Sequence, residues 1–180
     1  MNKAGRIEVI CGCMFSGKTE ELIRRVRRAQ IAKMSVIVFK PKIDSRFSNT
    51  QIVSHNKIKI DSHCISSPND ILDYSTEYDV FGIDETQFFD KDIINVCKKL
   101  ATIGKRVIIA GLDKDYKSNP FGFMPHLMCE ADYLVKLRAI CIKCSGSASY
   151  TKRTTEEIDQ VVIGELDKYQ ALCRNCYNNL

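Results

Sequence analysis

The chain has 180 residues, of which 44% are hydrophobic, and this is enough to bury the core of one globular domain with a small appendage. The formal charge of +5, from 27 Lys and Arg against 22 Asp and Glu, permits anionic ligands but is too small to indicate nucleic-acid binding by itself. No segment approaches the ~20 consecutive apolar residues of a membrane span. Residues 1–6 lack the apolar run of a signal peptide, so a cytoplasmic protein is expected.

Predicted strands and helices alternate along most of the chain. Short apolar runs predict strands at 7–11, 36–39, 78–83, 107–110 and 133–140. Helical periodicity predicts one helix from Thr19 onward and another over 90–103, while the polar residues 42–57 predict a loop. This alternation is typical of an α/β fold with a parallel sheet covered by helices. Because the composition changes near residue 138, we expect an α/β core at 1–138 and a small second domain at 139–180.

The first motif is a phosphate-binding loop (P-loop) between the first predicted strand and helix. It matches GxxxxGK[ST] in full, with the members Gly12, Cys13, Met14, Phe15, Ser16, Gly17, Lys18 and Thr19. Backbone N–H groups of such a loop surround phosphate oxygens, Lys18 reaches the β- and γ-phosphates of ATP, and Thr19 is placed to bind Mg²⁺. The alternative is an ordinary strand–turn–helix connection that carries Gly-Lys-Thr by chance.

Two carboxylates, Asp84 and Glu85, end the apolar strand at 78–83. Ligands bind at the carboxyl ends of strands in open α/β sheets, so Asp84 is expected to hold Mg²⁺. Glu85 is expected to accept a proton from a hydroxyl that attacks the γ-phosphate. Adjacent side chains of an extended strand end point in different directions, which would separate the two roles. The alternative is an acidic pair at a helix N-terminus with no chemistry.

Two CxxC pairs lie near the C-terminus, namely Cys141 with Cys144 and Cys173 with Cys176. Four thiolates with this spacing predict a closed, structural zinc site in a reducing compartment. A redox pair and a chance arrangement are the alternatives. The enclosed segment 145–172 is either a lid over a substrate or a hairpin without a ligand.

Together these motifs resemble the thymidine kinases shared by animal cytosol, many bacteria and poxviruses. The resemblance runs from Ile7 to Tyr177. It rests on the P-loop and the four cysteines, and on the segments 44–46, 84–89, 111–113, 120–121, 150–153, 162–164 and 167–169.

The resemblance implies a RecA-like P-loop core and a C-terminal zinc-binding domain whose lasso loop covers the nucleoside. It implies transfer of the γ-phosphate of ATP to the 5′-hydroxyl of thymidine, with Glu85 as the catalytic base. The implied ATP and Mg²⁺ residues beyond the P-loop are Asp44, Arg46, Asp84 and Gln87. The implied thymidine contacts are Met14, Phe88, Tyr116, Phe121, Gln160, Val161, Val162, Ile163, Gly164 and Tyr169.

By the same resemblance the chain forms a homotetramer that thymidine triphosphate inhibits, with no membrane and no stable nucleic-acid partner. Three positions depart from the family pattern. Cys13 stands where proline is common, Thr86 where a small residue is usual, and Tyr116 where phenylalanine is often found. None of these changes removes a catalytic group, but they bear on substrate tolerance.

Two other classes of protein remain as alternatives. The first is a P-loop ATPase that acts on nucleic acid, and the second is a zinc-ribbon nucleic-acid-binding protein with a vestigial P-loop. The fold does not separate the first from a nucleoside kinase, because fold does not fix function. The small size and the clamped segment favour a small-molecule substrate, and the modest charge argues against the second.

Overall fold

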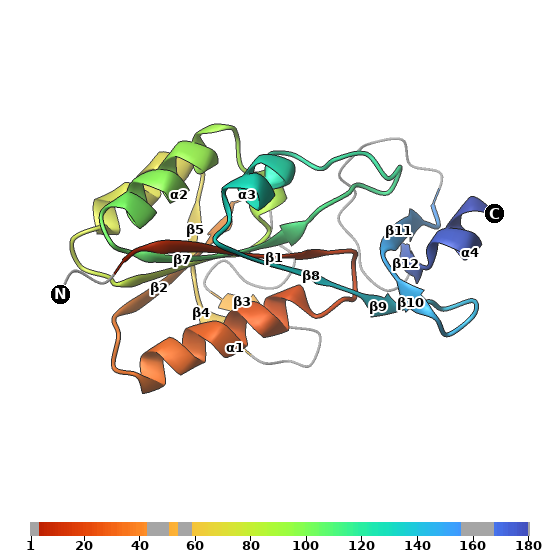
Figure 1. Cartoon of the computed structure of the whole chain (residues 1–180), viewed down its shortest axis with the longest axis horizontal. Helices are drawn as coiled ribbons and strands as arrows, with labels where there is room; N and C mark the ends of the chain where they lie inside the picture. Colours follow the sequence, from red (N-terminus) through yellow and green to blue (C-terminus); the bar gives the residue numbers. More distant parts are fainter. Residues whose placement is uncertain (1–3, 43–50, 54–58, 156–167, 180) are drawn as a thin grey trace.

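A computed structural model describes residues 4–42, 51–53, 59–155 and 168–179, and at 51–53 and 59 it describes the backbone alone. The core is a six-stranded, all-parallel sheet (Figure 1). Its strands, in spatial order, are β5 (His63–Ile65), β2 (Val36–Pro41), β6 (Val80–Ile83), β7 (Arg106–Leu112), β1 (Arg6–Gly12) and β8 (Tyr133–Leu137). The predicted α/β class with a parallel sheet is therefore confirmed.

Helices cover both faces of this sheet. Helix α1 (Lys18–Ile31) lies on one face, and α2 (Asp92–Thr102) and α3 (Met124–Glu130) lie on the other (Figure 1). Successive residues of a strand point to opposite faces. Accordingly, Val9 and Cys11 pack in the α2 and α3 core, whereas Ile10 packs in the α1 core. Both faces of the central strands β1, β6 and β7 are buried, which explains why these strands read as continuous apolar runs.

Several predicted elements need correction. The strand predicted at 133–140 is two strands, β8 and β9 (Ala139–Ile140), because β8 pairs with β1 only as far as Gly12, where β1 turns into the P-loop. The predicted loop 42–57 contains β3 (Gln51–Val53), which pairs with β4 (Lys59–Asp61). The sequence reading also missed β5, α3 and the 3₁₀ helix η1 (Pro68–Tyr74), which are all short.

A C-terminal lobe lies beyond the carboxyl ends of β1 and β8 (Figure 1). It consists of β9, β10 (Ser147–Ala148), β11 (Tyr150–Arg153), β12 (Tyr169–Leu172) and α4 (Arg174–Asn178). Its apolar core joins Ala139, Cys141, Ala148, Ala171 and Leu172 with one residue of the P-loop, Cys13. The division of the chain into domains near residue 138 stays a prediction.

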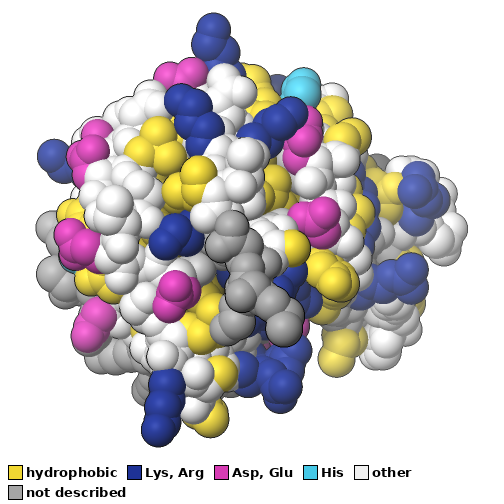
Figure 2. All heavy atoms as spheres, turned by 60° about the vertical axis from the view of Figure 1, so that its left-hand side comes forward, with side chains coloured by type: hydrophobic (Ala, Val, Ile, Leu, Met, Phe, Trp, Pro, Cys, Tyr) yellow, Lys and Arg dark blue, Asp and Glu magenta, His cyan; other side chains and the backbone are white. Residues whose placement is uncertain are grey.

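No helix in the described part of the chain is long and apolar enough to cross a membrane. Figure 2 shows the side that is on the left in Figure 1. Among the described residues visible in this view, Lys and Arg side chains are interspersed with acidic, apolar and other groups.

A buried ion-pair cluster holds α1 against the sheet. Glu8 on β1 is only 6% exposed. It accepts hydrogen bonds from Arg6 at 2.8 Å, Arg25 of α1 at 2.9 Å and Arg106 of β7 at 2.7 Å. Burial by itself raises the pKa of Glu8, but hydrogen bonds and charges from Arg106 and Arg6 outweigh it and lower the pKa from 4.5 to about 2.

We expect Glu8→Gln to destabilise the fold at neutral pH and to have less effect in acid. A pKa that folding lowers contributes stability above the unfolded value of 4.5, and this stability is lost as pH falls through the folded value of about 2. The shift corresponds to about 3 kcal/mol at pH 7. Urea unfolding between pH 7 and pH 3 measures the gap, which is the difference in free energy of unfolding between the parent and the variant. The variant Glu77→Gln, at an exposed position, is the control. A gap that stays constant over this range would contradict the expectation.

Candidate active site

The P-loop connects β1 to α1 and adopts a conformation that needs its glycines. Gly12 has φ 147° and Gly17 has φ 83°, both in the region that favours glycine. A Cβ added at Gly12 would also lie 2.5 Å from the carbonyl oxygen of Leu137. Phe15, with φ 64°, is a non-glycine residue in the left-handed region. Such backbone strain clusters at functional sites, which agrees with the predicted phosphate-binding role of this loop.

The carbonyl oxygen of Cys13 organises the polar side chains of the loop. It accepts hydrogen bonds from the Lys18 ammonium at 2.8 Å and from the Ser16 hydroxyl at 2.8 Å. Lys18 therefore lies folded over the loop, and its charge is held at the N-terminus of α1, where the helix dipole also attracts anions.

Asp84 follows β6 and lies next to the start of α1. The Thr19 hydroxyl donates to Asp84 Oδ2 at 3.1 Å, and the backbone N–H of Glu85 donates to Asp84 Oδ1 at 3.0 Å. The carboxyl group is 5% exposed. The hydroxyl and carboxylate oxygens are close enough to bind one ion, and they are the hard oxygen ligands that Mg²⁺ prefers. The donor set therefore fits the predicted magnesium site.

Glu85 and Asp84 have different side-chain partners: Asp84 accepts from Thr19, and Glu85 accepts from Gln87. Glu85 is not extended: its φ of 48° and ψ of 39° place it in the left-handed region, before the 3₁₀ turn η2 (Thr86–Phe88). The turn directs its carboxylate to Gln87, whose side-chain amide donates to Glu85 Oε2. The oxygen of the same amide accepts from the backbone N–H of Leu112 at 3.0 Å. Gln87 thus fixes the Glu85 carboxylate relative to the end of β7.

Two glycines leave the space that Gln87 occupies. A Cβ at Gly111 would lie 2.8 Å from Gln87 Oε1, and a Cβ at Gly122 would lie 2.2 Å from the Gln87 carbonyl oxygen. Gln87 is 3% exposed. Its predicted contact with ATP or Mg²⁺ stays a prediction, and its observed partners are Glu85 and Leu112.

The described aromatic residues predicted to contact thymidine form two groups. Phe88 and Phe121 meet edge to face, with ring centroids 5.6 Å apart. Tyr116 and Tyr169 meet through Arg153, whose guanidinium carbon lies 3.7 Å from the centre of the Tyr116 ring. The same guanidinium donates to the Tyr169 hydroxyl at 2.9 Å. Arg153 therefore contacts two residues predicted for the thymidine pocket, a role that its sequence motif did not reveal.

The four paired cysteines come together. The Sγ atoms of Cys141, Cys144, Cys173 and Cys176 all lie within 4.8 Å of one another. A tetrahedral Zn²⁺ site with Zn–S bonds of about 2.3 Å places its sulfur atoms about 4 Å apart, so the donor set fits zinc. A backbone hydrogen bond involving Cys173 is the main cause that lowers the pKa of Cys141 to about 6. A side-chain hydrogen bond with Cys173 raises the pKa of Cys176 to about 12.

An ion pair between an exposed lysine and a buried carboxylate links β8 to the residue that follows β7. The Lys136 ammonium lies 2.6 Å from Asp113 Oδ2, and Asp113 is 5% exposed. The hydrogen bond to Asp113 raises the pKa of Lys136. Lys136 lies on β8, which β1 separates from β7, so no motif in the sequence pairs it with Asp113.

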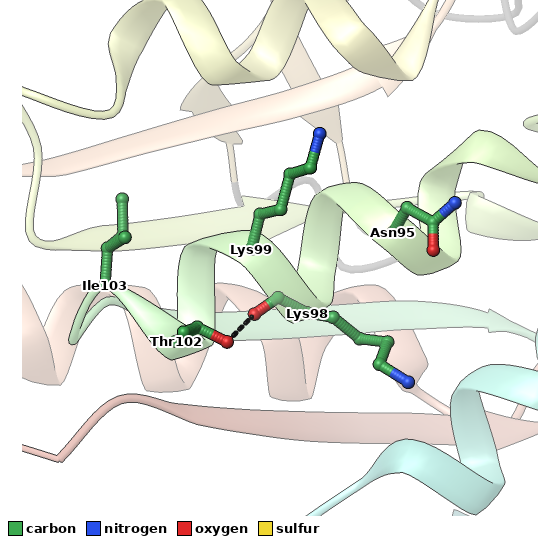
Figure 3. Close-up of a pocket in the computed structure, with 5 residues that line it drawn as sticks. All are labelled: Asn95, Lys98, Lys99, Thr102 and Ile103. Carbon is green, nitrogen blue, oxygen red and sulfur yellow. Dashed lines mark hydrogen bonds between the residues drawn. The ribbon is translucent and has the colours of Figure 1, made fainter.

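Other predicted site residues lie outside the described part of the structure. These are Asp44, Arg46, Gln160, Val161, Val162, Ile163 and Gly164. Their roles stay predictions. The hollow in Figure 3, of about 310 Å³, is lined by Asn95, Lys98, Lys99, Thr102 and Ile103 of α2 and its C-terminal end. It lies on the outer surface of that helix and contains none of the predicted site residues.

Comparison with known proteins decides the family. A family model described as thymidine kinase matches residues 5–177. The chain belongs to the thymidine kinase family. It is 55% identical over 175 residues to the thymidine kinase of Bacteroides thetaiotaomicron, covering 97% of this chain and 88% of that one. It is 51% identical over 173 residues to the thymidine kinase of a Rhodothermus species, covering 96% and 81% of the two chains.

A solved structure of AMPPCP-bound DnaA from Aquifex aeolicus matches at a TM-score of 0.47 and 15% identity, over 76% of this chain and 42% of that chain. A likeness this remote does not bear on function. The resemblance predicted from the motifs is confirmed, and the chain is an ATP-dependent kinase of this family.

Proposed function

We propose that this kinase transfers the γ-phosphate of ATP to the 5′-hydroxyl of thymidine, with Glu85 as the general base. The observation that carries the proposal is the position of Glu85. Glu85 directly follows Asp84, the hydrogen-bond partner of Thr19 at the start of α1, and its carboxylate is held by Gln87. A proton acceptor next to a phosphate-binding loop is what transfer to an alcohol requires.

In this proposal the residues Gly12–Thr19 bind the phosphates of ATP. The donors are Lys18 and the backbone N–H groups of the loop other than that of Met14, which donates to Thr151. Thr19 and Asp84 would hold Mg²⁺, which neutralises phosphate charge when it is bound. Asp44 and Arg46 are proposed to lie near the sugar and the phosphates.

Glu85 takes the proton of the 5′-hydroxyl as that oxygen forms its bond to the γ-phosphorus. The bond from the γ-phosphorus to the bridging oxygen breaks at the same centre, and ADP leaves with the bonding electrons. Because Glu85 already accepts one hydrogen bond from Gln87, its carboxylate is oriented before substrate binds.

For the nucleoside, we propose that Met14, Phe88 and Phe121 pack against the thymine and that Tyr116 and Tyr169 complete its pocket. The residues Gln160–Gly164 are proposed to hydrogen-bond the base through their backbone. We further propose a structural Zn²⁺, a homotetramer, inhibition by thymidine triphosphate and a cytoplasmic location.

Tyr169→Ala should weaken thymidine binding by about tenfold or more and leave ATP affinity within about twofold of the parent. The substitution removes an aromatic side chain from the proposed pocket, and burial of a large side chain contributes about 1.5–3 kcal/mol. Tyr169 lies on β12, and its hydroxyl accepts a hydrogen bond from Arg153 of β11. Calorimetric titration with thymidine and with a non-hydrolysable ATP analogue measures both affinities. Equal losses of both would indicate a folding defect instead.

The experiment that tests the function is ATP turnover with a panel of nucleosides, with DNA, and with no acceptor. We expect ADP release that depends on thymidine and yields thymidine 5′-phosphate. ADP release that depends on DNA would instead favour the P-loop ATPase. Turnover without any acceptor would exclude a kinase with a sealed site.

A further inference from the structure

The P-loop is in direct contact with the C-terminal lobe through Cys13. This side chain is 2% exposed and packs in the apolar core of the lobe, not in the core of the sheet. Its thiol donates to the carbonyl oxygen of Ala148 on β10, with Sγ and O 3.4 Å apart. Burial raises the pKa of the thiol, so Cys13 behaves as a neutral, packed side chain.

The next residue makes a second contact to the lobe. The backbone N–H of Met14 donates to the Thr151 hydroxyl oxygen on β11, 3.0 Å away. Thr151 is 5% exposed and Met14 is half-buried, so this hydrogen bond is partly shielded from water. The N–H of Met14 is therefore directed at the lobe and not at the centre of the P-loop.

These two anchored residues set the geometry of the groups that face a phosphate. The carbonyl oxygen of Cys13 holds both Lys18 and Ser16 at 2.8 Å. The backbone then enters the left-handed region at Phe15 and again at Gly17. A rotation of the peptide between Cys13 and Met14 would move the Lys18 ammonium and redirect the N–H groups that follow.

We propose that the four-cysteine lobe is the anchor of the P-loop and that Thr151 is a positioning residue for ATP. The proposal rests on the assignment of this loop to ATP under the proposed function. When a loop is in its binding-competent conformation for only a fraction of the time, its apparent affinity for the ligand falls by that same fraction. Without the Thr151 oxygen, the Met14 N–H loses its observed acceptor and must pair with another group or with water, which lowers the fraction of P-loops in the binding-competent conformation.

Strand β11 extends this role to the nucleoside side of the site. Thr151 and Arg153 are two residues apart and therefore project from the same face of the strand. Thr151 holds the P-loop, while Arg153 holds Tyr116 and Tyr169. Tyr150, on the opposite face, stacks on Tyr177 of α4 at 4.8 Å between ring centroids. One short strand thus fixes residues proposed for both substrates.

The test compares Thr151→Val with Thr151→Ser. Valine keeps the shape but lacks the acceptor, whereas serine keeps the hydroxyl. Calorimetry with the Mg²⁺ complex of a non-hydrolysable ATP analogue, without thymidine, measures the affinity. We expect a loss of about tenfold in Thr151→Val, the size expected for an unsatisfied buried donor, and recovery in Thr151→Ser. Thr102→Val makes the same chemical change on the exposed surface of α2 and should bind as the parent does.

Affinity of Thr151→Val within twofold of the parent overturns the proposal, as does an equal loss in Thr151→Ser. If thermal unfolding shows that Thr151→Val does not fold, Cys13→Ala removes the other contact and carries the same test. A parent that binds the ATP analogue but does not phosphorylate thymidine contradicts the proposed function alone. In that case, weaker binding of the ATP analogue by Thr151→Val still supports the proposal that the lobe anchors the P-loop.

Discussion

Glu85→Gln should lower the rate of thymidine phosphorylation by about 10²–10⁴-fold, the usual contribution of a general base. Glutamine has the size of glutamate and can accept a hydrogen bond, but it cannot take a proton from the 5′-hydroxyl. Thymidine and ATP affinities should stay close to those of the parent. The loss therefore falls on kcat and not on KM, as expected for an interaction made in the transition state.

The surroundings of Glu85 make this substitution a clean test. The Gln87 amide can still donate to the side-chain oxygen of a glutamine at position 85, and the other end of that amide remains on the Leu112 N–H. The left-handed backbone at position 85 is equally accessible to both side chains. The variant should therefore keep the local structure and lose only the proton acceptor.

The measurement is steady-state kinetics at saturating ATP and thymidine, together with thymidine binding in the absence of ATP. Glu130→Gln is the matched control, since Glu130 is exposed on α3 and pairs only with the exposed Lys98 in the described structure. An activity of Glu85→Gln within a few-fold of the parent would show that Glu85 is not the base.

The sequence was sufficient to place the P-loop and the acidic pair at one edge of a sheet. Strands with continuous apolar runs are buried on both faces, and parallel strands bring their carboxyl ends together. The contact between Thr19 and Asp84 follows from this geometry, although 65 residues separate them. The four cysteines were predictable for another reason, because their spacing is itself the signature of a metal site.

Contacts between the P-loop and the lobe have no such signature. Met14 and Thr151 lie 137 residues apart, and a threonine within an alternating strand looks like an ordinary surface residue. Arg153 likewise gives no local sign that it packs between two tyrosines. Glu85 was expected to be extended because the run before it is a strand. The structure instead places it in the left-handed region before a 3₁₀ turn that contains Gln87, whose side chain accepts from the distant Leu112 N–H.

One missed element did carry a signal. The 3₁₀ helix η1 starts with Ser67, Pro68 and Asp70, which form a capping box with proline at the first position. This pattern was available in the sequence. By contrast, the end of β8 at Leu137 depends on where its partner β1 stops, which no property of residues 133–140 reveals.

Freshly purified, reduced protein should contain one Zn²⁺ per chain, and Cys144→Ser should lose most of it. The lobe has a small apolar core of mostly short side chains, so its own burial provides little stability. A structural zinc site contributes about 10–16 kcal/mol of apparent binding energy, and that energy becomes folding energy when the site does not exist in the unfolded chain. Removing one ligand should therefore unfold or loosen residues 139–179 while the parallel sheet remains folded.

Elemental analysis gives the metal content, and hydrogen exchange across the chain shows which segments loosen. Cys129→Ser is the matched control, because Cys129 is exposed on α3 and outside the cluster, and it should keep full zinc. Absence of zinc from the reduced parent would contradict the assignment, as would full zinc in Cys144→Ser. Because Cys13 and Met14 are held by the lobe, the loss of zinc should also weaken binding of the ATP analogue. Loss of zinc with unchanged ATP affinity would separate the metal site from the P-loop.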